Sequence, residues 1–212
     1  MFEYILFDFD GTIFDTVEGI TKSVRYAINK FGKDAELEDL RCFAGPPLVD
    51  MFMSRFGLSK DEAVQAVAYY RERYKPTGIY ESRPFPGVKE LLEGLIKLGK
   101  PLAIATSKPQ VMAEELLSRS GLIEYFDLIC GALDDKNNAK WQIVTRVLEN
   151  FGAKPEQAVL VGDTKYDVIG AHQCHVKCIG VEYGYAAAGE LEESGADYIV
   201  KDTEELLKLL SE

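Results

Sequence analysis

Short apolar runs alternate along the chain with longer segments in which apolar residues repeat at helical spacing. The runs cover residues 4–7, 101–105, 126–130, 158–161, 178–181 and 198–200. The segments with helical spacing between and after them cover 88–98, 111–120, 138–151, 167–174 and 203–210. Continuous apolar runs are typical of strands buried on both faces of a parallel sheet. Their alternation with helices predicts an α/β fold with a doubly wound parallel sheet.

The stretch between the first two predicted strands has a different pattern. Helical spacing covers 17–31, 37–42 and 50–56, and a further helix begins after Ser59, which forms a capping-box pattern with Glu62. We find no convincing strand between residues 17 and 80. A purely helical block inside a strand and helix alternation predicts an inserted all-helical domain at 16–81, with the sheet domain formed by 1–15 and 82–212.

Composition narrows the possible partners. The 212 residues carry a formal net charge of −11, which argues against a nucleic-acid polymer or an anionic membrane surface as partner. No apolar stretch is long enough to span a membrane, and no basic segment precedes the first apolar run, so we expect no signal peptide and a cytoplasmic location. The four cysteines form no C-x-x-C pair and are interpreted as reduced thiols.

One cluster in the chain has side chains that could bind structural zinc. It consists of His172, Cys174, His175 and Cys178. The spacing does not match the usual zinc-finger patterns, so we favour a helix end followed by a strand with a buried cysteine. His175 also stands where a helix-ending glycine is common, which concerns local stability more than chemistry.

Two acidic residues end the first predicted strand. Asp8 and Asp10 are separated by one residue, and Gly11 then allows the chain to turn away. Ligands of open α/β sheets bind beyond the carboxyl ends of the strands. Two nearby carboxylates repel each other unless a cation lies between them, and Mg²⁺ is the hard cation that prefers oxygen ligands at phosphate sites. The stretch therefore predicts a metal-dependent acid site.

Other polar residues follow the later strands. Taken alone, Thr106 and Ser107 are typical of a helix cap, Lys140 of a solvated helix lysine, and Asp163 of a strand exit. Their occurrence at successive strand ends, together with the first motif, instead favours one shared site.

The motif Phe-Asp-Phe-Asp-Gly-Thr at 7–12, with these later positions in order, resembles the haloacid dehalogenase-like superfamily. The inserted block resembles the helical C1 cap of subfamily I, in the phosphoglycolate phosphatase-like and bacterial 5′-nucleotidase-like branch. The resemblance implies a Rossmann-like core, Mg²⁺ as cofactor, and hydrolysis of a small phosphorylated metabolite. We expect a monomer or a weak homodimer.

The first motif and Asp163 are expected to carry the chemistry. A carboxylate can attack phosphorus, so Asp8 is the candidate nucleophile that forms an aspartyl-phosphate. Asp10 is the candidate general acid for the leaving oxygen and then the general base for water. The resemblance implies that Mg²⁺ is held by the side chains of Asp8 and Asp163 and by the backbone carbonyl of Asp10.

Four further residues are expected to support that chemistry. Thr106 and Ser107 can donate hydrogen bonds to phosphoryl oxygens, helped by a following helix start. Lys140 supplies positive charge to the same oxygens and to Asp8. Asp167 is expected to orient metal-bound water or Lys140. Relatives often have proline after this lysine whereas Trp141 follows here, which leaves Lys136 as the fallback; Gly11, Thr12 and Lys108 are given supporting roles at most.

The predicted insert offers candidates for substrate choice. Arg41 could pair with a substrate carboxylate or a second phosphate, or could equally be a solvated helix arginine. Gly45 and Pro46 belong to a loop that resembles the substrate-facing loop of the same branch, slightly nearer to its nucleotidase-like group. Dehalogenases of the superfamily that this chain resembles lack the second aspartate of the first motif, so the presence of Asp10 disfavours dehalogenase chemistry. A β-phosphoglucomutase-like mutase, transfer to an acceptor other than water, and an inactive binding module remain as alternatives.

Overall fold

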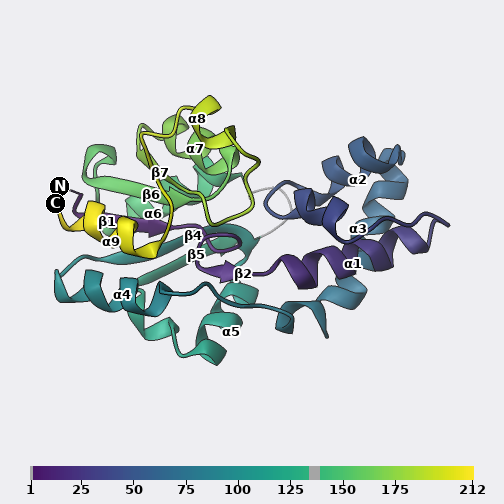
Figure 1. Cartoon of the computed structure of the whole chain (residues 1–212), viewed down its shortest axis with the longest axis horizontal. Helices are drawn as coiled ribbons and strands as arrows, with labels where there is room; N and C mark the ends of the chain where they lie inside the picture. Colours follow the sequence, from purple (N-terminus) through teal and green to yellow (C-terminus); the bar gives the residue numbers. More distant parts are fainter. Residues whose placement is uncertain (1, 134–138) are drawn as a thin grey trace. The chain divides into compact units, whose positions relative to one another are not determined.

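The computed structural model describes residues 2–133 and 139–212. Within them, six strands form a parallel sheet in the order β5-β4-β1-β6-β7-β8 (Figure 1). The strands are β1 (Tyr4–Phe7), β4 (Leu102–Pro109), β5 (Leu128–Ala132), β6 (Ala158–Gly162), β7 (Lys177–Val181) and β8 (Tyr198–Val200). The predicted α/β doubly wound sheet is confirmed.

Helices connect these strands and follow the last one. They are α4 (Val88–Lys97), α5 (Gln110–Ser120), α6 (Lys140–Phe151), α7 (Lys165–Gln173), the short α8 (Glu190–Glu193) and α9 (Thr203–Ser211). From β1 the chain adds β4 and β5 on one side, then crosses to add β6, β7 and β8 on the other. The direction therefore reverses beside β1, and such a switch point is where open α/β sheets bind ligands.

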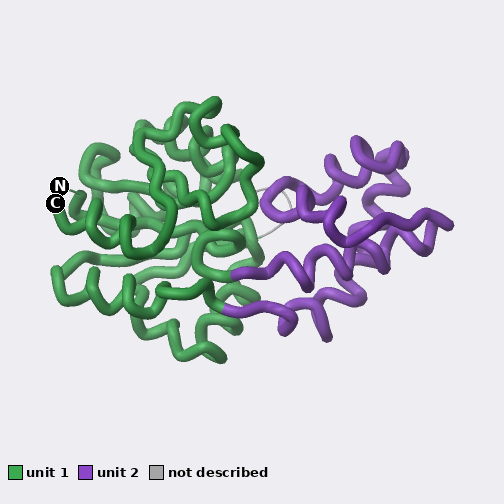
Figure 2. The backbone as a smooth tube through the Cα atoms, in the orientation of Figure 1, with its two compact units in different colours: residues 1–14, 84–212 green, residues 15–83 purple. Residues whose placement is uncertain are grey.

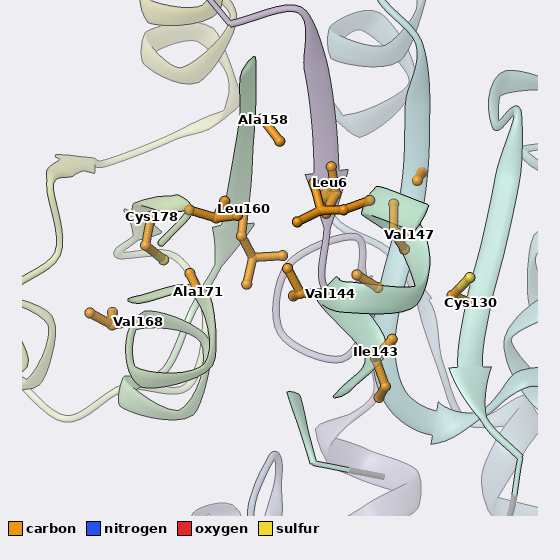
Figure 3. Packing of buried hydrophobic residues seen from close by; sticks show 14 of the residues in the cluster. Leu6, Cys130, Ile143, Val144, Val147, Ala158, Leu160, Val168, Ala171 and Cys178 are labelled. Carbon is orange, nitrogen blue, oxygen red and sulfur yellow. The ribbon is translucent and has the colours of Figure 1, made fainter. Parts of the chain in front are cut away.

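The sheet is buried on both faces. On one face, side chains of β1, β6 and β7 pack against α6 and α7 (Figure 3). This cluster includes Leu6, Leu160, Cys178, Ile143, Val144, Val147, Val168 and Ala171. Ile5 and Phe7 alternate with Leu6, are equally inaccessible, and point to the opposite face. Burial on both faces explains why the strands are continuous apolar runs.

The chain divides into two compact units, residues 1–14 with 84–212 and residues 15–83 (Figure 2). The second unit contains α1 (Val17–Asn29), the 3-10 turn Glu38–Phe43, α2 (Leu48–Phe56), α3 (Lys60–Tyr74) and the 3-10 turn Gly78–Tyr80. The capping box before α3 is present, since Glu62 accepts from the Ser59 backbone N–H at 2.8 Å and donates its own to Ser59 Oγ at 3.3 Å. Two-residue strands, β2 (Phe14–Asp15) and β3 (Arg83–Pro84), pair where the chain enters and leaves this unit.

The end of β4 differs from the prediction. The strand continues past Ala105 to Pro109 with a shift in its pairing to β5, and α5 begins at Gln110, within one residue of the start expected at 111. Thr106 and Ser107 therefore lie in extended chain rather than at a helix cap, whereas the helix expected after them is present. Proline disfavours helical backbone in the residue before it, so Pro109 keeps Lys108 extended.

His175, the second residue after the end of α7, has a strained backbone conformation. In the described part of the chain it is the residue other than glycine with a positive φ, 57°. We expect His175→Gly to raise the free energy of unfolding by up to about 1 kcal/mol, because a Cβ disfavours this conformation, although glycine's freedom in the unfolded chain offsets part of the gain. Urea unfolding measures the change. Gly121→Ala, at the residue with positive φ directly after α5, where φ is 70°, is the control and should destabilise.

Candidate active site

The predicted acidic residues meet at the carboxyl ends of neighbouring strands. Asp8 follows β1 and remains tied to β6, because its backbone N–H donates to the Val161 carbonyl at 2.8 Å. Asp163 follows β6, and Asp167 lies in the first turn of α7. Asp8, Asp163 and Asp167 are all buried. The switch point beside β1 thus concentrates three carboxylates in a place with little access to water.

Lys140, the first residue of α6, joins two of these acids. Its Nζ lies 2.6 Å from Asp8 Oδ1 and 2.8 Å from Asp167 Oδ1, and donates to the Ala105 carbonyl at 3.0 Å. The lysine can lie this close to α7 because residue 170 is glycine: a Cβ there would lie 2.5 Å from Lys140 Cβ. The structure therefore brings Lys140 to the acids with Trp141 following it. The fallback Lys136 lies outside the described residues.

The electrostatics of this group keep Lys140 charged. Burial alone would lower the pKa of the Lys140 ammonium, but Asp167 and Asp8 outweigh it and raise that pKa above its ordinary value. Burial, with the charges of Asp167 and Asp10 and against the opposing charge of Lys140, raises the pKa of Asp8 to about 6. Burial and the neighbouring Asp167 and Asp8 also raise the pKa of Asp163. Lys140 therefore does not balance the negative charge of Asp8, Asp163 and Asp167, and the cluster could accept a further cation.

The donor set fits a divalent cation. Asp8, Asp163 and Asp167 each offer one carboxylate oxygen, and these atoms lie within 4.8 Å of one another. Counting Asp10 and its partner Lys108 as well, the described site has four carboxylates and two ammonium groups, so its formal charge is −2. Oxygen ligands of this charge suit Mg²⁺. The contribution of the Asp10 backbone carbonyl stays a prediction.

Asp163 is positioned mainly by backbone. Its Oδ2 accepts from the Tyr185 N–H at 2.8 Å, and Thr12 Oγ1 donates to Oδ1 at 3.4 Å. Two glycines lie against it: a Cβ on Gly11 would be 2.0 Å from Asp163 Oδ2, and one on Gly184 would be 2.2 Å from Asp163 Cβ. Sequence reasoning missed the 184–185 segment, because nothing in its residue types indicates an approach to β6.

We expect Gly184→Ala to weaken metal binding by about 10-fold or more, because the added methyl displaces the Asp163 carboxylate and supporting contacts of this kind hold metal ligands in place. Electron paramagnetic resonance with Mn²⁺ as the probe measures the affinity without turnover. Gly94→Ala is the control, since the atoms nearest to its methyl belong to the side chain of Leu207 and not to the acid cluster. Unchanged Mn²⁺ affinity in Gly184→Ala would show that this contact does not position Asp163.

Asp10 pairs with Lys108, a residue expected from the sequence to have a supporting role at most. Lys108 Nζ lies 2.9 Å from Asp10 Oδ1 and 3.2 Å from Oδ2, and the lysine side chain is 4% exposed. The extended chain at the end of β4 places residues 106 and 108 on one face, so Lys108 and Thr106 point inward together. A predicted strand that extended to residue 109 would have placed Lys108 on the same face as Thr106 and so indicated its role.

The remaining candidates are placed as follows. Thr106 is buried and its Oγ1 accepts from the Lys108 N–H at 3.2 Å, while Ser107 is half-buried. In the second unit, Arg41 is exposed and lies 3.7 Å from Glu38, and Gly45 has a φ of 101° beside the half-buried Pro46. In residues 2–133 and 139–212, the acid cluster is the one group of three or more side chains that could hold a metal ion together.

The residues once considered for zinc have other surroundings. Cys178 is buried in β7, and His172 Nε2 lies 3.0 Å from Asp197 Oδ2. Cys174 Sγ donates to the Trp141 carbonyl at 3.2 Å. These residues therefore lie at the end of a helix and in the strand that follows it, as expected. Among the described helices, none combines the length and the apolar character needed to cross a bilayer.

Comparison with known proteins agrees with this architecture. The model of the haloacid dehalogenase-like hydrolase family matches residues 5–181. The chain is 39% identical over 208 residues to a 5′-nucleotidase of Pseudomonas aeruginosa, covering 97% of this chain and 94% of the relative. It is 33% identical to the pyrophosphatase PpaX of Halalkalibacterium halodurans, covering 97% and 95% of the two chains.

A solved structure is equally similar. The crystal structure of a predicted phosphatase from Clostridium acetobutylicum superposes with a TM-score of 0.95 at 40% identity, covering 100% of this chain and 99% of that one. The family match spans both the first motif and Asp163, the residues around which the acid cluster is built. The chain therefore belongs to the haloacid dehalogenase-like hydrolase family, as one of its phosphatases.

Proposed function

We propose that the protein is a Mg²⁺-dependent phosphomonoester hydrolase that forms an aspartyl-phosphate on Asp8. The observation that carries the proposal is the position of Asp8. Its carboxylate lies at the buried end of β1, 2.6 Å from the Lys140 ammonium and in the same 4.8 Å group as Asp163 and Asp167. An oriented carboxylate beside a fixed cation suits nucleophilic attack on an anionic phosphoryl group.

The chain's own residues account for both half-reactions. An Asp8 oxygen forms a bond to phosphorus as the bond to the ester oxygen breaks, and Asp10 gives its proton to that leaving oxygen. Asp10, now ionised, takes a proton from water as water attacks the aspartyl-phosphate, which frees Asp8 and inorganic phosphate. When bound by Asp8, Asp163 and Asp167, Mg²⁺ supplies charge neutralisation for the incoming phosphate.

Three further side chains stabilise the phosphoryl oxygens in this proposal. Lys140 contributes a fixed ammonium that is already held by Asp8 and Asp167. Thr106 and Ser107 lie at the end of β4, next to β1 in the sheet, where hydroxyl and backbone donors can reach the same oxygens.

The relatives and the second unit support a substrate class for this proposal. We assign a small phosphorylated metabolite, with nucleoside 5′-monophosphates first, because a 5′-nucleotidase is 39% identical and the 45–48 loop is nearer to that group. 2-Phosphoglycolate and inorganic pyrophosphate are the competing substrates; the second is suggested by the PpaX relative. A sugar-phosphate mutase is the second candidate reaction.

A substrate panel tests this proposal. Phosphate release is measured with nucleoside 5′-monophosphates, 2-phosphoglycolate, pyrophosphate and sugar phosphates, each with Mg²⁺ and with a chelator. We expect Mg²⁺-dependent release that is fastest for a nucleoside monophosphate. Preference for another substrate would overturn the substrate assignment alone. The absence of release from every substrate, with interconversion of sugar phosphates in its place, would favour the mutase.

We also propose that the unit 15–83 acts as the cap that selects the substrate. The acids, Lys108 and Lys140 all belong to the other unit, whereas Arg41, Gly45 and Pro46 belong to this one. Exchange of residues 41–48 for the corresponding loop of a phosphoglycolate phosphatase should change the substrate ranking and leave Mg²⁺ dependence intact. An unchanged ranking would contradict this division.

A further inference from the structure

We propose that Lys108 is a positioning residue for the general acid, holding the Asp10 carboxylate where it can protonate the leaving oxygen. The inference rests on the proposed phosphatase mechanism and adds a residue to it. Lys108 Nζ contacts both Asp10 oxygens, at 2.9 and 3.2 Å. An ammonium between both oxygens of one carboxylate fixes the direction of that side chain as well as its charge.

Electrostatics explain why Asp10 needs such a partner. Asp10 is separated from Asp8 by one residue, and two carboxylates this close in the chain repel each other. Lys140 already lies against Asp8 and Asp167, so the repulsion between the two acids of the first motif is countered at Asp10 by a different cation. Each acid of the motif thus has its own ammonium, Lys140 for the nucleophile and Lys108 for the general acid.

The surroundings of Lys108 hold it in one place. Pro109 and the continued pairing of β4 with β5 keep its backbone extended, and its backbone N–H donates to Thr106 Oγ1 at 3.2 Å. Its Nζ lies 5.6 Å from the centroid of the Phe9 ring, which itself stacks on Phe14 at 4.7 Å and is fully buried. Lys108 is therefore buried and is held at its backbone, near its head group and by its charge partner. These contacts suit a residue that positions another side chain and not one that serves solubility.

The test compares leaving groups that do and do not need a proton. Single-turnover release of the leaving group is measured for 2,4-dinitrophenyl phosphate, whose phenolate leaves unprotonated, and for the best alkyl phosphate of the panel. We expect Lys108→Met to slow the alkyl ester by about 100-fold, the size of a general-acid contribution, and to slow the dinitrophenyl ester by less than about 3-fold. A residue that only stabilises the fold would slow both equally.

Further variants guard against a trivial result. Lys108→Arg keeps the charge and should restore part of the alkyl-ester rate, whereas Lys177→Met, at the amino end of β7, should change neither rate. In an Asp10→Asn background, Lys108→Met should have no further effect, because the acid it positions is gone. Thermal unfolding of each variant verifies the fold.

Two outcomes would overturn the inference. One is an equal loss on both esters in Lys108→Met, and the other is an additional loss when Lys108→Met is combined with Asp10→Asn. Failure of the underlying mechanism is distinguishable from either, because the wild-type protein would then release no leaving group from any ester in the presence of Mg²⁺.

Discussion

Phosphate release by the Asp8→Asn variant is expected to fall by about 10⁴-fold or more, the scale on which loss of a nucleophile acts in covalent catalysis. The amide group of asparagine occupies nearly the same space as the carboxylate of aspartate, so the variant retains the packing at the end of β1. It cannot, however, form the acyl phosphate. Asp61→Asn, an exposed residue of the first turn of α3, is the matched control and should keep full activity.

The same variant separates the nucleophile from the fold. Without metal, the folded protein holds the Asp8 proton up to a pKa of about 6, whereas the unfolded chain releases it near the ordinary pKa of 3.8. Between these values the folded state binds more protons, so this group's contribution lowers the free energy of unfolding as the pH rises. Asp8→Asn lacks that titration, and in the presence of a chelator its stability relative to wild type should increase from about pH 4 to about pH 7.

Thermal unfolding of both proteins across this pH range measures the difference. Asp8→Asn with full activity would exclude Asp8 as the nucleophile. If the variant is inactive but its stability relative to wild type does not change between pH 4 and pH 7, the assignment of Asp8 as nucleophile stands. The electrostatic description of the cluster is then contradicted.

The variant with the largest expected loss of stability is Lys140→Met. Methionine fills a similar volume, but it leaves Asp8 and Asp167 buried without the ammonium that contacts both of them. Removing one partner of a buried ion pair typically costs about 3–5 kcal/mol, because the remaining charge is left without compensation. We expect a loss of this size in denaturant unfolding of the metal-free protein, together with loss of activity.

A second substitution tests whether charge is the cause. Asp167→Asn removes one of the two stranded carboxylates and should recover part of the stability of Lys140→Met, although not its activity. Lys97→Met, an exposed lysine at the end of α4, is the control and should be close to wild type. Wild-type stability of Lys140→Met, or no recovery in the double variant, would contradict the charge argument.

Much of the sheet domain could be predicted from sequence because burial on both faces leaves a simple pattern. The run at 4–7 is β1 residue for residue, and the run at 198–200 is β8. The carboxyl ends of parallel strands meet at one edge, so Asp8 and Asp163 could be expected near each other although 155 positions separate them. Topology makes such distant residues neighbours.

Other parts of the site depend on geometry that residue types do not record. Lys108 reaches Asp10 only because β4 continues to Pro109, and the apolar run that predicted this strand ended at residue 105. The Tyr185 N–H that binds Asp163 belongs to the backbone, which any residue other than proline would supply. The two-residue strands β2 and β3 are too short to leave a periodic pattern.

The pairing of β2 with β3 brings together the two points at which the chain enters and leaves the helical unit. Within that unit the entering helix and the leaving turn also touch through backbone, since a Cβ on Gly19 would lie 1.9 Å from the Gly78 carbonyl oxygen. An insertion whose two ends are joined in this way adds almost no loop to the domain that carries it. We expect such a unit to tolerate lengthening, shortening or replacement by a short hairpin while the host sheet keeps its connections. With the proposed cap role, that would give one catalytic core a route to many substrates.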